Sequence, residues 1–198
     1  MRLLLPKVKP GSYDLKKDPM VVIWYLHMSL NRSLKSTGLL SIIRSSSVLK
    51  YLHLRALGAK VAYSANFSAE LELVDPSLIT IDEGVIIGGR CYMGCHVVFD
   101  GKLILGNIHL KKNSFISLGN VIGQGTVIGE KAVIGAGNYL YRDEIPDNYK
   151  LPNFAWSEGS PKQQEGAKRK EEQNLLNPEF MQFNLSYGVL NENKIQLQ

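Results

Sequence analysis

The sequence predicts an all-β core built as a triangular coil of short strands, with a helical segment before it and a polar tail after it. Large apolar residues recur every six positions through the middle of the chain, and a second column of aliphatic or small residues stands two positions before them. A period of six fits neither an α-helix nor a simple alternating strand. It fits three short strands per coil with a corner after each, so that stacked coils bury a continuous apolar column.

The composition is that of a folded globular protein rather than a disordered or fibrous one. Of the 198 residues, 44% are hydrophobic and 21% are charged. The longest apolar run, Met20 to Leu26, is far shorter than the roughly 20 residues of a membrane-spanning helix, and no signal peptide is evident. Two cysteines, Cys91 and Cys95, cannot by themselves build a disulfide framework or a four-ligand zinc site. These features predict a cytoplasmic protein without a spanning segment.

Residues 1–58 are predicted to form a basic helical head. Residues 1–60 carry 11 Lys and Arg against 2 Asp, a net charge of +9, whereas the rest of the chain has a net charge of −4. Pro19 suits the first turn of a helix, with Asp18 before it as the N-cap. A second stretch from Leu39 to Leu57 has nearly helical apolar spacing, and Gly58 follows it in a C-terminal cap position.

The head also predicts a partner surface. Its basic residues alternate with apolar runs that include Trp24 and Tyr25. This pattern favours peripheral contact with an anionic membrane surface through residues 1–58. No nucleic-acid-binding module accompanies the basic residues, so nucleic acid is not an expected partner.

The repeat predicts about four coils over residues 59–141. The step of six is broken once, by a five-residue step from Leu105 to Leu110, and a fainter extension upstream carries a two-residue insertion around Asp75-Pro76. The predicted inward anchors are Ile81, Ile87, Met93, Phe99, Leu105, Leu110, Ile116, Ile122, Ile128, Ile134 and Leu140. The upstream anchors are Val61, Phe67 and Leu73. Residues 142–162 read as an exit segment, and residues 163–198 as a polar tail that is either helical or disordered.

The hexads resemble those of the hexapeptide-repeat acyltransferases, whose fold is a left-handed parallel β-helix. The matching runs are Ile122-Gly123-Gln124-Gly125-Thr126, Ile128-Gly129-Glu130-Lys131-Ala132 and Ile134-Gly135-Ala136-Gly137-Asn138. The resemblance implies transfer of an acyl group, acetyl above all, from a pantetheine thioester such as acyl-CoA to a hydroxyl or amine of a small-molecule acceptor. It also implies a homotrimer with the acyl-donor sites between neighbouring prisms, and acyl-CoA as a cosubstrate rather than a permanently bound cofactor.

A narrower resemblance spans Leu5 to Lys162. This stretch is similar to the carboxy-terminal transferase-like module of polylysine-synthetase-type relatives of non-ribosomal peptide synthetases. The similarity is carried by the runs 9–13, 55–60 and 96–106, by the Ile-Gly hexads, and by Trp156 with the Gly159-Ser160-Pro161 exit. In such proteins the module follows a carrier domain that presents a thioester on phosphopantetheine.

Two histidines in the coil region are candidate general bases for acyl transfer. The reaction needs a base for the acceptor proton, and imidazole titrates near neutrality. His96 lies three residues before the Phe99 anchor, at a predicted corner, and is the preferred base, with Asp100 as the carboxylate that orients its ring. His109 precedes the Leu110 anchor, is predicted to point outward, and is the alternative base.

The glycines of the later hexads are candidate contacts for the pantetheine arm. By default each glycine permits a coil corner, and each also lets a ligand approach the backbone closely. The glycines in question are Gly123, Gly125, Gly129, Gly135 and Gly137.

Two other interpretations of the same residues are a zinc enzyme and a non-catalytic scaffold. A zinc site of the carbonic-anhydrase type needs three histidine ligands, and the hexad region holds only His96 and His109, so no metal is predicted. The second reading is a non-catalytic β-helix, a scaffold or interaction module derived from a synthetase-like ancestor. Binding of coenzyme A distinguishes that scaffold from the enzyme.

Overall fold

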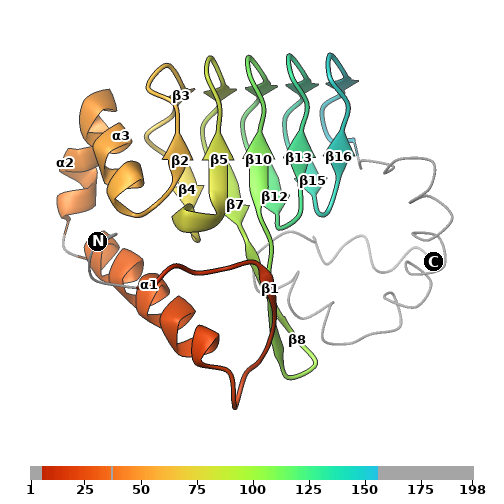
Figure 1. Cartoon of the computed structure of the whole chain (residues 1–198). Helices are drawn as coiled ribbons and strands as arrows, with labels where there is room; N and C mark the ends of the chain where they lie inside the picture. Colours follow the sequence, from red (N-terminus) through yellow and green to blue (C-terminus); the bar gives the residue numbers. More distant parts are fainter. Residues whose placement is uncertain (1–5, 37, 156–198) are drawn as a thin grey trace, which may run out of the picture. The chain divides into compact units, whose positions relative to one another are not determined.

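The computed structural model describes residues 6–36 and 38–155. Within these residues, stacked coils form three parallel sheets, and each complete coil contributes one strand to each sheet (Figure 1). The first sheet contains β2 (Lys60–Val61), β5 (Ile79–Ile81), β10 (Ile108–Leu110), β13 (Val127–Ile128) and β16 (Glu144–Ile145). The second contains β3 (Asn66–Phe67), β6 (Ile86–Ile87), β11 (Phe115–Ile116), β14 (Val133–Ile134) and β17 (Lys150–Leu151). The third contains β4 (Glu72–Leu73), β7 (Tyr92–Gly94), β12 (Val121–Gly123) and β15 (Tyr139–Leu140).

Consecutive strands along the chain belong to different sheets, which makes each group of three a triangular coil. Neighbouring strands within a sheet are parallel, and Phe115 pairs with Val133 just as Val121 pairs with Tyr139. Four coils are complete, and β16 with β17 adds two sides of a fifth. These two strands lie in the segment predicted as the exit. The architecture fits the predicted left-handed parallel β-helix and the predicted number of about four coils.

The predicted apolar column forms the core of the coils. Ten of the eleven anchors are at most 3% exposed. The upstream anchors Val61, Phe67 and Leu73 are also buried. The second column, two positions before the anchors, is buried as well where it becomes polar, as at Ser114, Asn120 and Thr126. Inward positions therefore follow the period of six along almost the whole repeat.

Phe99 is the exception, and its prediction as an inward anchor is wrong. Its side chain is 49% exposed, because residues 96–105 leave the coil as an antiparallel hairpin of β8 (His96–Phe99) and β9 (Lys102–Leu105). Asp100 and Gly101 turn the hairpin with φ values of 48° and 66°, the left-handed backbone that an Asp-Gly turn adopts. The five-residue step at Leu105 marks the return of the chain to the coil.

The N-terminal head packs at the β2 end of the coils (Figure 1). Its strand β1 (Gly11–Asp14) pairs antiparallel with β9. Three helices follow, α1 (Pro19–Ser36), α2 (Leu39–Ser45) and α3 (Ser47–Ala56). Asp18 Oδ1 accepts a hydrogen bond from the Met20 N–H over 2.9 Å, and Gly58 has a φ of 99°, so both predicted helix ends are confirmed.

The stretch from residue 39 to 57 is two helices rather than one. Ser46 has extended backbone angles between α2 and α3, and its side chain accepts from the Leu49 N–H over 3.4 Å. Among the described residues, no helix combines the length and apolar character needed to cross a bilayer. The predicted Trp156 to Pro161 exit motif and the tail from residue 163 lie outside the described residues.

Candidate functional site

His96 lies at the base of the hairpin, where it faces a carboxylate from the preceding coil. It is the first residue of β8 and pairs with Leu105 of β9. Its ring Nδ1 is 2.7 Å from Oδ2 of Asp75, a residue 21 positions earlier in the sequence. The side chains of His96 and Asp75 are 19% and 4% exposed. The coil structure therefore brings a nearly buried carboxylate against a partly accessible imidazole.

The other contacts of Asp75 assign the proton between the two side chains. The Cys95 backbone N–H donates to Oδ2, and the Trp24 indole N–H donates to Oδ1, each over 2.9 Å. Because an ionised carboxylate only accepts hydrogen bonds, His96 Nδ1 is the third donor. A neutral ring then carries its proton on Nδ1, and Nε2 is the unprotonated nitrogen, which is the arrangement that a general base requires.

The carboxylate that contacts His96 is therefore Asp75 and not Asp100, so the prediction of Asp100 for this role is wrong. Asp100 is exposed and lies in the turn at the tip of the hairpin. The hexad pattern does not indicate Asp75, because this residue lies outside the repeat, in the insertion around Asp75-Pro76 where the 3₁₀ turn η1 (Pro76–Leu78) begins. That insertion was the available signal, since an irregularity in a regular coil displaces a loop from the coil surface.

Helix α1 takes part in the site through one face. Trp24 is 9% exposed, and its ring meets the His96 ring edge-on at a centroid distance of 4.9 Å. Asn31, two turns later, donates to the carbonyl oxygens of Leu73 and Val74 over 3.1 and 3.2 Å. The expectation that Trp24 faces a membrane is wrong, because this side of the helix packs against the coils, whereas Tyr25 is 64% exposed.

His109 has a carboxylate partner of its own on the outer face of the first sheet. Its Nε2 is 2.9 Å from Asp82 Oδ2, and the two side chains are 39% and 30% exposed. The pair lies on β10 and directly after β5, two neighbouring parallel strands. His109 points outward as predicted, and the more open setting makes its hydrogen bond compete with water.

The glycines proposed as pantetheine contacts have close packing partners within the coils. A Cβ added to Gly129 would lie 2.4 Å from the Pro146 carbonyl carbon, and one on Gly135 would lie 2.5 Å from the Asn153 nitrogen. Gly125 and Gly137 have positive φ values of 79° and 69°. A Cβ on Gly123 would meet the ring of Tyr141 at 2.8 Å. Each glycine therefore has a structural role, and a role in pantetheine binding stays a prediction.

The two cysteines beside the site are buried thiols. Cys91 and Cys95 are 1% and 0% exposed, and neither is in a disulfide. Burial raises the pKa of both thiols, and the nearby Asp75 carboxylate raises the pKa of Cys95 further. Thiolates are the reactive form, so these side chains serve as core residues, as the sequence indicated for Cys91.

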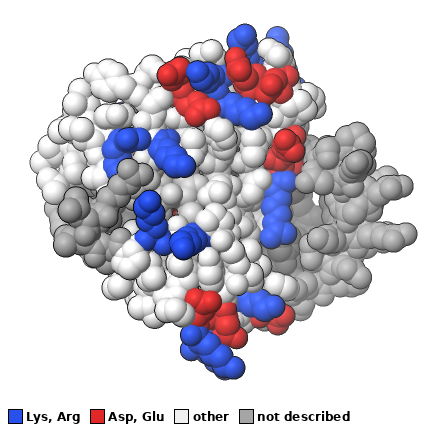
Figure 2. Space-filling model, viewed as in Figure 1, with Lys and Arg blue, Asp and Glu red and all other residues white. Residues whose placement is uncertain are grey.

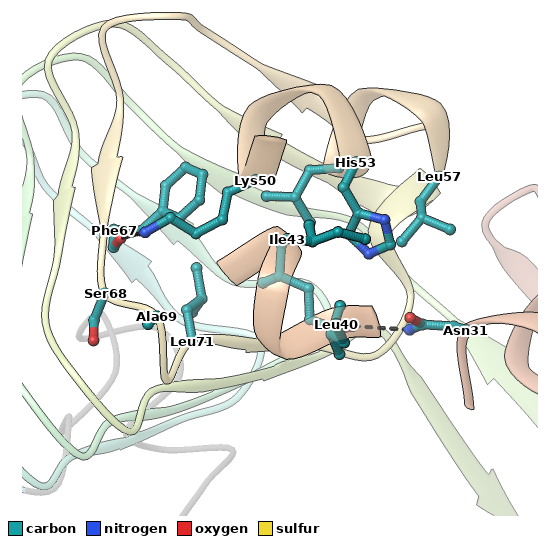
Figure 3. A pocket seen from close by; sticks show the side chains of 12 residues that line it. Asn31, Leu40, Ile43, Lys50, His53, Leu57, Phe67, Ser68, Ala69 and Leu71 are labelled. Carbon is teal, nitrogen blue, oxygen red and sulfur yellow. Dashed lines mark hydrogen bonds between the residues drawn. The ribbon is translucent and has the colours of Figure 1, made fainter. Parts of the chain in front are cut away.

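A solvent-open pocket lies between the head helices and the first coil (Figure 3). Apolar side chains make up most of its wall, and Lys50 Nζ donates to the Phe67 carbonyl oxygen over 2.9 Å at one side. A second, smaller pocket is lined by Trp24, His27 and Asp75 among others. Neither lining includes His96 or His109, so neither pocket by itself encloses a reaction at these rings.

Charged side chains are unevenly distributed on the face seen in Figure 2. On the face seen in Figure 2, several basic side chains over the helical side have no acidic neighbour, whereas acidic and basic side chains mix along the upper edge. One ion pair between neighbouring coils joins Lys112 Nζ and Glu83 Oε2 over 3.1 Å. Within residues 6–36 and 38–155, no three His, Cys, Asp or Glu side chains are grouped to hold a metal ion.

The sequence and the structure of the chain are similar to different known proteins. No family model matches the chain. A segment of 115 residues, 58% of the chain, is 32% identical to delta-poly-L-ornithine synthetase of Acinetobacter baumannii strain AB307-0294, and the chain spans only 8% of that protein. The structure is similar to a hexapeptide-repeat-containing acetyltransferase of Vibrio cholerae (TM-score 0.52, 16% identity, 68% of this chain and 88% of that one). It is also similar to a maltose O-acetyltransferase of Clostridium difficile 630 (TM-score 0.55, 15% identity, 73% and 89%).

The structural similarity establishes the fold. The sequence similarity supports the predicted resemblance to synthetases of the polylysine type. The chain therefore has the β-helix fold of the hexapeptide-repeat acetyltransferases and resembles part of a polyornithine-synthetase-type protein, which confirms both predicted resemblances.

Proposed function

We propose that the protein transfers an acyl group, acetyl above all, from a pantetheine thioester such as acetyl-CoA to a hydroxyl or amine, with His96 as general base. The observation that carries this proposal is the 2.7 Å contact between His96 Nδ1 and the buried Asp75 carboxylate. It fixes the ring and leaves Nε2 as the nitrogen that accepts a proton. His109 is the alternative base, on a more exposed pair.

The proposed reaction proceeds by proton transfer at Nε2 and attack on the thioester. Nε2 takes the proton of the acceptor O–H or N–H while the acceptor atom bonds to the thioester carbonyl carbon. The tetrahedral intermediate collapses, the carbon–sulfur bond breaks, and the sulfur takes the proton back from the imidazolium. Asp75 stabilises that imidazolium through its hydrogen bond at Nδ1 and stays ionised throughout.

The acyl donor is proposed from the fold. Two proteins that share it are acetyltransferases by name, which supports acetyl as the group transferred. The five hexad glycines are proposed to let the pantetheine arm pass close to the coil backbone. The acceptor is proposed to be a small molecule, because one of the two proteins that share the fold is by name a maltose O-acetyltransferase.

A homotrimer is proposed as the active assembly. Ile86 and Phe115 are neighbours in the second sheet and are 46% and 41% exposed. A closed assembly of three prisms would bury such an apolar row.

Peripheral contact with an anionic membrane is proposed for the outer face of the head, in an otherwise cytoplasmic protein. Val22, Tyr25 and Leu26 of α1 are between 47% and 64% exposed. They lie within the segment that carries the net charge of +9, and each basic residue near an anionic surface contributes about 1 kcal/mol at low salt. Flotation with vesicles should succeed with anionic lipid and fail with neutral lipid or at high salt; flotation that ignores lipid charge would contradict this contact.

The function is tested by the release of free thiol from acetyl-CoA in the presence of hydroxyl and amine acceptors. A positioned general base contributes about 10²–10⁴-fold, so His96→Ala should reduce turnover by that factor and leave coenzyme A affinity nearly unchanged. Asp75→Asn should reduce turnover as well, because an amide cannot stabilise the imidazolium to the same extent.

The matched control is His109→Ala, which removes the other paired histidine of the coils. If His109→Ala abolishes transfer and His96→Ala does not, His109 is the base. If the wild-type protein neither binds coenzyme A nor releases thiol with any acceptor, the enzyme proposal is abandoned in favour of a non-catalytic scaffold.

A further inference from the structure

We propose that Trp24 is a positioning residue for the His96–Asp75 pair, so that the N-terminal head completes the site on the coils. This inference rests on the proposed role of His96 as base. It assigns to α1 a contribution to the chemistry, although Trp24 is 51 residues from Asp75 in the sequence.

Trp24 holds the side of the carboxylate that His96 does not use. Its indole N–H donates to Asp75 Oδ1 over 2.9 Å, while Oδ2 accepts from His96 and from the Cys95 backbone. With partners on both oxygens, the carboxylate cannot rotate about its Cβ–Cγ bond without losing a hydrogen bond. Loss of the indole donor leaves Oδ1 buried without that partner and frees the group to turn.

Trp24 also contacts the imidazole itself. The two rings are 4.9 Å apart between centroids and inclined by 60°, an edge-on arrangement. One side chain therefore limits the rotation of both members of the pair, the carboxylate through a hydrogen bond and the imidazole through packing.

Helix α1 is attached to the same loop at a second point, which fixes the approach of Trp24. Asn31 donates to the carbonyl oxygens of Leu73 and Val74, the two residues directly before Asp75. Residues seven apart lie on one face of a helix. Two polar contacts from one helix face thus locate the segment that carries the carboxylate.

A role in packing alone would not require these contacts. Buried tryptophan N–H groups normally find an acceptor, and a backbone carbonyl serves that need. Here the acceptor is the carboxylate that orients a candidate base. The two roles differ in one measurable respect, because a positioning residue controls which nitrogen of His96 carries the proton.

The test is Trp24→Phe in the full-length chain, followed by ¹⁵N-histidine NMR. Phenylalanine keeps an aromatic ring against His96 and removes the N–H donor. In the wild-type protein the His96 signals, assigned by their loss in His96→Ala, should be those of the Nδ1–H form. In Trp24→Phe we expect a mixture of both neutral forms, with kcat about tenfold lower and KM for acetyl-CoA unchanged.

The matched control is Tyr63→Phe, which removes a polar group from a 74% exposed residue of the coils. It should change neither the His96 signals nor kcat. If Trp24→Phe folds and retains the wild-type His96 signals and kcat, the positioning role is refuted. If the His96 signals change but no transfer occurs even with the wild-type protein, the positioning of His96 holds and the proposed function fails.

The unaltered protein supplies a readout that does not depend on the folding of a variant. The Trp24 indole N–H should exchange slowly with solvent, since both it and its acceptor are buried. An indole proton that exchanges as fast as an exposed one would refute the hydrogen bond and the proposal with it.

Discussion

At the scale of single residues, the site depends on buried polar groups whose partners come from distant parts of the chain. Asp75 is 6% exposed and receives N–H donors from Trp24, Cys95 and His96. A buried carboxylate without such donors would be strongly unfavourable. The same burial makes the neighbouring thiols inert, which leads to a prediction about their chemistry.

Cys91 and Cys95 should resist alkylation in the folded protein at pH 8 and react fully after denaturation. Burial raises the pKa of both thiols, so the thiolate is scarce in the native state. Mass spectrometry after a short exposure to iodoacetamide measures the extent. Rapid modification of Cys95 in the native protein would contradict the structure around Asp75.

The raised pKa values of Cys91 and Cys95 determine whether the stability rises or falls with pH. A thiol with a raised folded pKa stabilises the protein fully below its unfolded pKa, close to the ordinary value of 9.0. This contribution declines as the pH rises above that value toward the folded pKa. The free energy of unfolding should therefore fall above about pH 9, and less steeply in Cys95→Ala.

At the scale of the elements, the coils depend on close approach between successive backbones. Gly135 follows the β14 anchor Ile134, and an added Cβ there would meet Asn153 and Pro152 backbone atoms at 2.5 Å. Gly101 in the hairpin turn is needed for a different reason. A Cβ at Gly101 would have open space around it, but the residue has a positive φ of 66°. Gly135 is therefore required because there is no space for a side chain, and Gly101 because of its backbone conformation.

Gly135→Ala should destabilise the protein by about 1–3 kcal/mol, the usual cost of overpacking a filled site. Chemical denaturation monitored by circular dichroism measures the change. The matched control is Gly101→Asn, which should be nearly neutral because asparagine tolerates the left-handed region. Equal stability losses for the two variants would indicate that the coils do not approach as closely at Gly135 as the structure has them.

At the scale of the whole molecule, the second sheet of the coils presents an outer apolar row. Ile86 and Phe115 pair in register on adjacent parallel strands, and Phe115 pairs with Val133 on the next. An exposed row of this kind on a regular sheet is a surface for association. The proposed trimer follows from it and can be tested directly.

Light scattering should give about three times the 22.1 kDa of one chain, and Phe115→Glu should shift the mass toward the monomer. A charge placed in the centre of an apolar interface must be desolvated, which opposes association. Tyr63→Glu, at a 74% exposed position beside the head, should leave the mass unchanged. A wild-type monomer at tens of micromolar would exclude the trimer.

The period of six was readable from the sequence because each coil repeats the same local environment. Inward anchors such as Ile122 and Ile128 are buried wherever the hexad continues, and so the coils, the head helices and the candidate His96 could all be predicted. The hairpin was partly visible as a five-residue step and an Asp-Gly pair. The hexad pattern nevertheless predicts a coil at β8, because an alternating strand and a hexad can both place an apolar residue at Phe99.

The sequence by itself determined the repeat, the number of coils and the two candidate histidines, since all of these are periodic or local features. Only the tertiary structure decided that Asp75 meets His96, because stacking of one coil on the next joins residues 21 positions apart. Only the docking of α1 decided that Trp24 is buried at this site rather than exposed on the head. Such contacts depend on how an irregular loop and a separate helix pack, and no local pattern encodes that packing.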